Sequence, residues 1–166
     1  MVKRLTKAAL LTALALILFT AEAQIPPVVP IPGVKLGLAN VVTVYAMFAM
    51  TPWEALAILL VRIFLGSVFA GSMGAILYSL SGGLLCWLIM LPLRKLLTEK
   101  QIWVASVFGA IFHNVGQTLA AMAILQTASV AVYLPILLLS GVVTGLFTGL
   151  CAQFAYTRLR KIRGAE

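Results

Sequence analysis

One arginine stands deep inside an apolar stretch of the sequence. Arg62 lies about halfway along residues 53–70. An arginine at that depth in a lipid bilayer costs on the order of 3 kcal/mol, so it must face protein and find a partner. Because a guanidinium matches carboxylate or phosphate through paired hydrogen bonds, Arg62 is a candidate for holding an anionic ligand. The alternative is a structural charge satisfied by helix carbonyls or by an amide such as Asn114 or Gln117.

Three more polar side chains lie near the middle of a second apolar stretch, residues 102–125. His113 and Gln117 are four apart on one face of a helix, and Asn114 is adjacent. Polar groups at that depth are costly unless they meet a partner or a cavity. They are therefore candidate ligand-binding residues, with hydrogen bonding between helices as the alternative role. A lone histidine does not predict a metal site, because no second His, Cys or acid completes a coordination shell.

A proline-rich run from Ile25 to Gly33 precedes the segment Lys35–Asn40. Proline lacks the backbone N–H and blocks the preceding helical turn, so we expect a rigid extended loop followed by a short polar turn. The loop would carry Lys35 and Asn40 to one end of a helical bundle and cover whatever binds there. The predicted site for a small, anionic ligand comprises Lys35, Asn40, Arg62, His113, Asn114 and Gln117.

The acidic residues argue against an enzyme. The sequence contains no aspartate, and its glutamates are scattered at positions 22, 54, 99 and 166. Magnesium-assisted phosphoryl or prenyl chemistry needs clustered carboxylates. There is also no P-loop pattern for ATP hydrolysis. We therefore expect a protein without catalytic residues, metal or cofactor.

Composition indicates an integral membrane protein. Of the 166 residues 63% are hydrophobic and only 10% charged, and the mean hydropathy is +1.12. So few polar groups cannot build a water-facing surface. Since a span needs roughly 20 apolar residues, we expect one domain, 1–166, an all-α bundle of six transmembrane helices. The expected helices cover about 5–21, 36–50, 53–70, 74–93, 102–125 and 132–156.

The net charge of +8 would suggest nucleic acid in a soluble protein, but here the basic residues lie at helix ends. With both termini in the cytoplasm, ten of the 12 Lys and Arg residues lie on the cytoplasmic side. Only Lys35 is then outside, and Arg62 lies within the membrane. We therefore expect cytoplasmic termini and no nucleic-acid partner.

The first helix allows two interpretations. A basic start, a short apolar core and the Ala21-Glu22-Ala23 end fit a secretory signal peptide. We favour a retained helix, because the following segments are themselves membranous and because Ala9 and Ala13 form a small-xxx-small pair that lets another helix approach closely.

Small residues in the other apolar stretches are expected to pack between helices. Gly141, Gly145 and Gly149 recur every four residues, a spacing that favours a close packing face. Cys86 and Cys151 have no CxxC spacing, so we expect two small core residues rather than a metal or redox site.

Four segments carry a family resemblance that covers most of residues 5–157. They are Lys35–Val42, Leu60–Ser67 around Arg62, Ser79–Gly83 and Gly109–Gln117. Together they resemble the Gx transporter family, also labelled heptaprenyl diphosphate synthase component I. That family is similar to the substrate-binding S components of energy-coupling factor (ECF) transporters, which are small six-helix vitamin-binding proteins.

The resemblance implies uptake across a prokaryotic cytoplasmic membrane. An S component holds its ligand in the outer half of the bundle, then joins a transmembrane coupling protein and two ATPases and topples to release the ligand inside. Ala9 and Ala13 match the position of its motif for that coupling protein. The implied ligand is a quinone or isoprenoid precursor or a vitamin-like compound. The alternative is a non-catalytic accessory subunit of polyprenyl diphosphate synthesis or of a membrane redox assembly.

Overall fold

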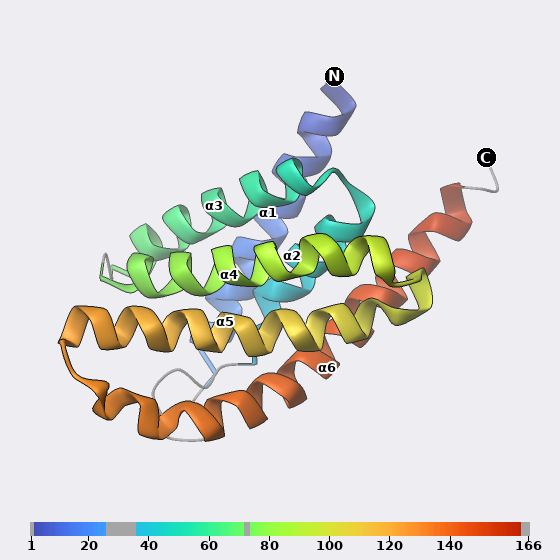
Figure 1. The fold of residues 1–166 in the computed structure, drawn as a ribbon. Coiled ribbons are helices and arrows are strands. Elements are labelled where there is room, and N and C mark those ends of the chain that lie inside the picture. Colours follow the sequence, from blue (N-terminus) through green and yellow to red (C-terminus); the bar gives the residue numbers. More distant parts are fainter. Residues whose placement is uncertain (1, 26–35, 72–73, 164–166) are drawn as a thin grey trace.

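The computed structural model describes residues 2–25, 36–71 and 74–163, and within them every regular element is helical (Figure 1). The helices are α1 (Val2–Ala23), α2 (Leu38–Ala49), α3 (Pro52–Phe69), α4 (Ala75–Leu96), α5 (Ile102–Leu125) and α6 (Leu134–Arg163), with the 3-10 segments η1 (Glu99–Gln101) and η2 (Ala128–Tyr133). The all-α prediction is confirmed. The helix α6 continues past its expected end at residue 156 because residues 157–163 are mostly good helix formers without glycine or proline.

Five segments are long and apolar enough to cross a membrane: α1, α3, α4, α5 together with η1, and α6 together with η2. The remaining helix, α2, has 12 residues. At 1.5 Å per residue it is about 18 Å long, against roughly 30 Å of hydrocarbon in a bilayer. Five of the six expected spans are therefore supported, and a full span by α2 stays a prediction. Seven residues of α2 are buried, so this short helix is enclosed by protein.

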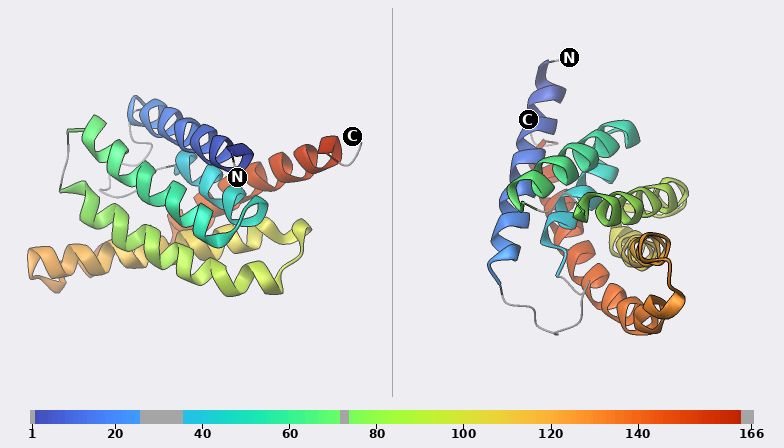
Figure 2. Two further views of the ribbon diagram at one scale, coloured as in Figure 1. Left: turned by 90° about the horizontal axis from the view of Figure 1, so that it is seen from above. Right: turned by 90° about the vertical axis from the view of Figure 1, so that its left-hand side faces the viewer.

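The helices close a ring that does not follow chain order (Figure 2). The helix α1 packs on α3, and α3, α4, α5 and α6 then follow one another around the ring. The short α2 fills the remaining side, because it contacts α6, α1 and also α3. Residues from the start and the end of the chain therefore face the same interior.

Helices approach one another closely at several glycines. A Cβ atom on Gly145 of α6 would lie 2.8 Å from the Cα of Val107 in α5, and one on Gly149 would lie 2.6 Å from the Cα of Trp103. On Gly141 it would lie 2.8 Å from a side-chain nitrogen of α5. The predicted glycine packing face is confirmed, and it brings the backbones of α5 and α6 together.

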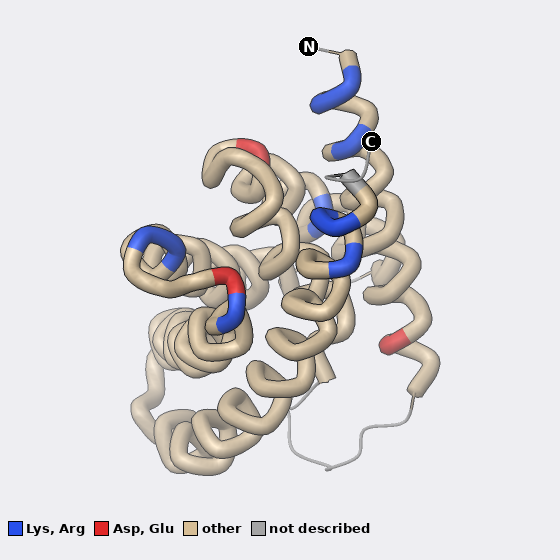
Figure 3. Tube along the Cα trace, turned by 90° about the vertical axis from the view of Figure 1, so that its right-hand side faces the viewer, with Lys and Arg blue, Asp and Glu red and all other residues tan. Residues whose placement is uncertain are grey.

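Both termini of the described chain lie at one end of the ring (Figure 1). There the Lys7 Nζ of α1 donates to the Ala49 carbonyl of α2 at 3.4 Å, and the Tyr156 hydroxyl of α6 donates to Glu99 of η1 at 3.3 Å. Lys and Arg residues of α1, α4 and α6 gather at this end (Figure 3). We call the region around Lys7, Ala49, Glu99 and Tyr156 the basic end.

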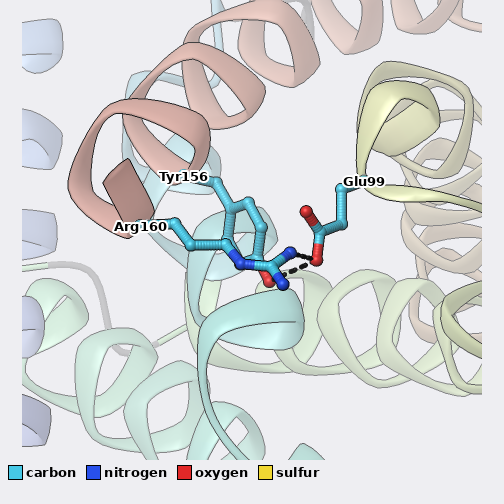
Figure 4. A network of polar contacts seen from close by, with 3 residues as sticks. All are labelled: Glu99, Tyr156 and Arg160. Atoms are coloured by element: carbon cyan, nitrogen blue, oxygen red, sulfur yellow. Dashed lines mark hydrogen bonds and ion pairs between the residues drawn. The ribbon is translucent and has the colours of Figure 1, made fainter. Parts of the chain in front are cut away.

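Polar contacts hold the connections at the basic end. Glu99 forms an ion pair with Arg160 and accepts the Tyr156 hydrogen bond, so η1 is tied to α6 (Figure 4). The Trp87 indole of α4 donates to the Pro52 carbonyl at 2.9 Å, which ties α4 to the start of α3. Because the side chains of Arg160 and Glu99 are 62% and 45% exposed, their pair adds at most about 1 kcal/mol to stability.

An apolar core fills the ring next to the basic end. Its largest fully buried members include Met47 of α2, Ile58 of α3, Met90 of α4 and Ile102 of α5. These residues belong to the end of α2 and of α4 and to the beginning of α3 and of α5. The packed core therefore occupies one half of the bundle, and the other half is left to the polar residues described next.

Candidate functional site

A cavity of about 560 Å³ lies inside the ring, in the half away from the basic end. Its walls come from the end of α1, the start of α2, the middle of α3, the first half of α4, the middle and end of α5, and the first half of α6. Apolar side chains such as Leu59, Ala121 and Leu137 alternate there with polar ones. The core around Met47 and Met90 lies between this cavity and the basic end.

Five of the six predicted ligand-binding residues line this one cavity. They are Asn40 of α2, Arg62 of α3, and His113, Asn114 and Gln117 of α5. The sixth, Lys35, lies outside the described residues. Residues that are up to 77 positions apart in the sequence thus line the same cavity, as expected if polar groups avoid lipid by facing a cavity.

Arg62 is held at one side by α2. Its side chain is buried, with 9% exposure, and its Nη2 donates to the Asn40 Oδ1 at 3.0 Å. The amide partner is therefore Asn40, not Asn114 or Gln117. The Arg62 Nε has no hydrogen-bond partner within the described parts of the chain. A buried donor without a partner costs about 1–3 kcal/mol, so this Nε–H is available to donate to an acceptor on a ligand in the cavity.

Asn40 lies in α2, as the expected helix over residues 36–50 predicts, and the expected polar turn does not extend to it. Gly37 takes a left-handed backbone conformation with φ +73°, which suits glycine, and α2 begins at the next residue. The Asn40 N–H donates to the Gly37 carbonyl at 2.8 Å. Asn40 therefore belongs to the first turn of α2, and its side chain is directed across to α3 through the bond to Arg62.

The three polar residues of α5 differ in their contacts. The Asn114 Nδ2 donates to the Leu137 carbonyl of α6 at 2.5 Å, so this amide also takes the alternative role of joining two helices. His113 and Gln117 pack against Gly82 of α4, where a Cβ would lie 3.1 Å from the His113 Cε1 and 2.7 Å from the Gln117 Cγ. The missing side chain at Gly82 makes room for both residues between α4 and α5.

Glu22 lines the same cavity, and the sequence analysis did not single it out. Its carboxylate accepts hydrogen bonds from the backbone N–H groups of Gly37 at 2.7 Å and Leu38 at 2.9 Å. The available signal was an acid that ends a long apolar helix shortly before the start of another helix. The sequence alone places Glu22 only among four scattered glutamates and in a possible signal-peptide end.

Hydroxyl groups supply further polar lining that the sequence analysis missed. The buried Ser106 Oγ and Thr148 Oγ1 lie 3.0 Å apart and join α5 to α6. The Thr43 Oγ1 of α2 is buried and has no hydrogen-bond partner among the described residues. Threonines and serines inside apolar helices were the signal, but such residues also bond their own helix, as Thr148 does to the Thr144 carbonyl.

The remaining predicted residues lie away from the cavity or give it no further chemistry. Ala9 and Ala13 are exposed on α1, on the outside of the ring. Cys86 is half-buried and lines the cavity, and Cys151 is half-buried on α6. Among the described residues no three His, Cys, Asp or Glu side chains gather as metal ligands would.

A family model described as heptaprenyl diphosphate synthase component I matches residues 11–155. The match includes every residue that lines the cavity. Comparisons with curated proteins and with solved structures give no match. The long apolar helices make the chain a multi-pass membrane protein. From the extent of the family match, the resemblance is confirmed, and the chain belongs to the heptaprenyl diphosphate synthase component I family.

Proposed function

We propose that the protein is the substrate-binding component of an ECF-type uptake transporter and binds a small anionic ligand. The observation that carries this proposal is the cavity of about 560 Å³ with a buried Arg62 in its wall, whose Nε has no partner in the described parts of the chain. Cavities of this size enclose a small organic molecule, with apolar walls for its body and a few polar groups that fix its orientation.

The described lining is suited to binding rather than to chemical transformation. Its one carboxylate belongs to Glu22, and both oxygens of that group already accept backbone hydrogen bonds. Prenyl or phosphoryl transfer assisted by metal ions needs several carboxylates at one place. We therefore propose no catalytic residue for this chain.

The distribution of basic residues supports loading from outside. The positive-inside rule puts the basic end in the cytoplasm, and the cavity then lies in the outer half of the membrane. The fully buried Met47, Ile58, Met90 and Ile102 separate it from the cytoplasmic side. A ligand bound there has no open path inward, so its release requires a rearrangement. We propose that a coupling membrane protein and ATPase subunits drive that step.

A second candidate function follows from the family description, which names a component of a prenyl diphosphate synthase. In that case the chain is a membrane accessory subunit, and a separate partner supplies the active site. Co-purification separates the two functions. Recovery with a coupling protein and ATPases supports uptake, whereas recovery only with a prenyl synthase supports the accessory role.

A ligand screen by thermal shift tests the proposed binding function directly. The purified protein would be heated with single vitamins, quinone head groups, prenyl acids and prenyl diphosphates. A compound that binds the folded state raises the apparent Tm, and the shift grows with the logarithm of its concentration over Kd. We expect at least one anionic compound to do so in wild type and to lose its effect when Arg62 is replaced. A panel without any such compound would remove the basis of the proposal.

We expect Ala9→Leu and Ala13→Leu to disrupt assembly with the coupling protein while ligand binding is kept. Both alanines are exposed on α1 and four residues apart, so a larger side chain holds a partner helix away without touching the cavity. Ala57→Leu on the exposed side of α3 is the matched control. The measurement is co-purification of a tagged chain with its partners, and complete complexes in both α1 variants would contradict the assignment.

A further inference from the structure

The start of α2 is capped by a residue from another helix. Gly37, at the N-cap position, gives no side-chain hydrogen bond, and the exposed donors of the first turn are instead taken by Glu22 of α1. By contrast, α3 is capped by its own residues, since Thr51 and Glu54 form a capping box. The carboxylate of Glu22 is therefore already hydrogen-bonded to α2, and it holds a negative charge at the start of that helix.

The free N–H groups of a helix N-terminus attract anions, because they are unsatisfied donors at the positive end of the helix dipole. Gly37 lines the cavity, as does Arg62. The cavity wall thus contains two positions that favour negative charge. At the start of α2, both carboxylate oxygens of Glu22 already accept hydrogen bonds from the free N–H groups. At Arg62, the Nε has no hydrogen-bond partner among the described residues.

The two positions are also linked through the backbone. Glu22 fixes Gly37 and Leu38, the Asn40 N–H donates to the Gly37 carbonyl, and the Asn40 side chain accepts from Arg62. The charge of Glu22 is therefore held in place relative to the guanidinium and does not move aside freely. A ligand that enters the cavity meets one available cation and one fixed anion in the described lining.

We infer that Glu22 is a selectivity residue that limits the cavity to ligands with one anionic group, of the monocarboxylate class, and excludes diphosphates. This inference rests on the proposed binding function. A single carboxylate pairs with the Arg62 fork and leaves Glu22 undisturbed. The additional charges of a diphosphate are repelled by the carboxylate of Glu22, which is fixed at the start of α2 in the wall of the same cavity.

The test is a matched panel of head groups measured on the full chain. Prenyl, aryl and saturated alkyl bodies would each be supplied as an alcohol, a monocarboxylate and a diphosphate, and each Kd measured in detergent or nanodiscs. In wild type we expect the monocarboxylate of the preferred body to bind about tenfold or more tightly than its diphosphate. This comparison needs no variant, so it tests the inference even if a substitution prevents folding.

The variant Glu22→Gln removes the charge and keeps one acceptor for α2. We expect its preference for monocarboxylate over diphosphate to fall by about tenfold, mainly because the diphosphate gains affinity. Glu54→Gln is the matched control, because Glu54 also caps a helix but is not part of the cavity lining. Its preference should equal that of wild type, although its stability falls in a similar way.

The possible outcomes distinguish the role of Glu22 from the proposed binding function. A wild-type preference for diphosphate, or an unchanged preference in Glu22→Gln, overturns the inference on Glu22 and leaves the binding function in place. Diphosphate binding that is present in Glu22→Gln and absent in wild type supports the inference on Glu22. If no member of the panel binds, or if binding does not depend on Arg62, the proposed function itself fails.

Discussion

Replacing Arg62 by alanine is expected to weaken binding of the anionic ligand at least about tenfold, which corresponds to about 1.4 kcal/mol. Arg62 is the only cation of the described cavity lining, and its Nε has no hydrogen-bond partner among the described residues. A charge-assisted hydrogen bond in such a water-poor place is worth more than one in water. The measurement is the Kd of the screened ligand by calorimetry on purified protein.

Two further variants separate charge from geometry and from stability. Arg62→Lys keeps the charge but loses the planar fork, so its affinity should fall between those of wild type and Arg62→Ala. Arg158→Ala, an exposed cation at the end of α6 far from the cavity lining, should bind as wild type does. An unchanged affinity in Arg62→Ala would refute the assignment of Arg62 to the site.

The depth of polar side chains in apolar segments was a useful guide to the cavity. Arg62, His113, Asn114 and Gln117 were selected only because lipid is a poor solvent for them, and the structure brings all four to one space. That argument depends on position along a helix, which the sequence states directly. It does not depend on how the helices are arranged.

Glu22 and the pairing of Arg62 could not be found in the same way. Glu22 lies at a helix end, where an acid costs little, and its role follows from the approach of α1 to the start of α2. Arg62 and its partner Asn40 belong to different helices, and two other amides, Asn114 and Gln117, were equally available by depth. Such pairs depend on tertiary packing, and the spacing of residues along the sequence does not predict which helices lie side by side.

The position of α2 was equally hidden. Residues 36–50 are as apolar as the lipid-facing stretches, so composition predicts a short span. The structure has a 12-residue helix there, with Ala39, Val42 and Met47 buried by its neighbours. Hydropathy does not distinguish lipid from a protein interior, because both are apolar surroundings. The small size of α2 was visible in the sequence, but its place between α1 and α6 was not.

Replacing Gly149 by alanine is expected to destabilise the bundle by about 1–3 kcal/mol, and Gly149→Leu by more. The new Cβ would lie 2.6 Å from the Cα of Trp103 and 2.7 Å from the Cβ of Ser106. The nearest of these atoms belongs to the backbone, so α5 and α6 must move apart to admit the methyl group. That movement would also disturb Ser106 and Thr148, whose hydroxyls lie 3.0 Å apart in the cavity wall. The measurement is the Tm of purified protein, together with ligand affinity.

Gly74→Ala provides the control for this experiment, because the same methyl group would meet no atom within 4 Å at that position. Gly74 is the exposed N-cap residue of α4, where alanine is somewhat less favourable than glycine, so Gly74→Ala should lower the Tm only slightly. In the interior of α6 alanine favours helix over glycine by roughly 1 kcal/mol, so any loss of stability in Gly149→Ala must come from the contact between helices. A Tm for Gly149→Ala equal to that of Gly74→Ala would mean that α5 and α6 are not packed through their glycines. The cavity wall between them would then need another explanation.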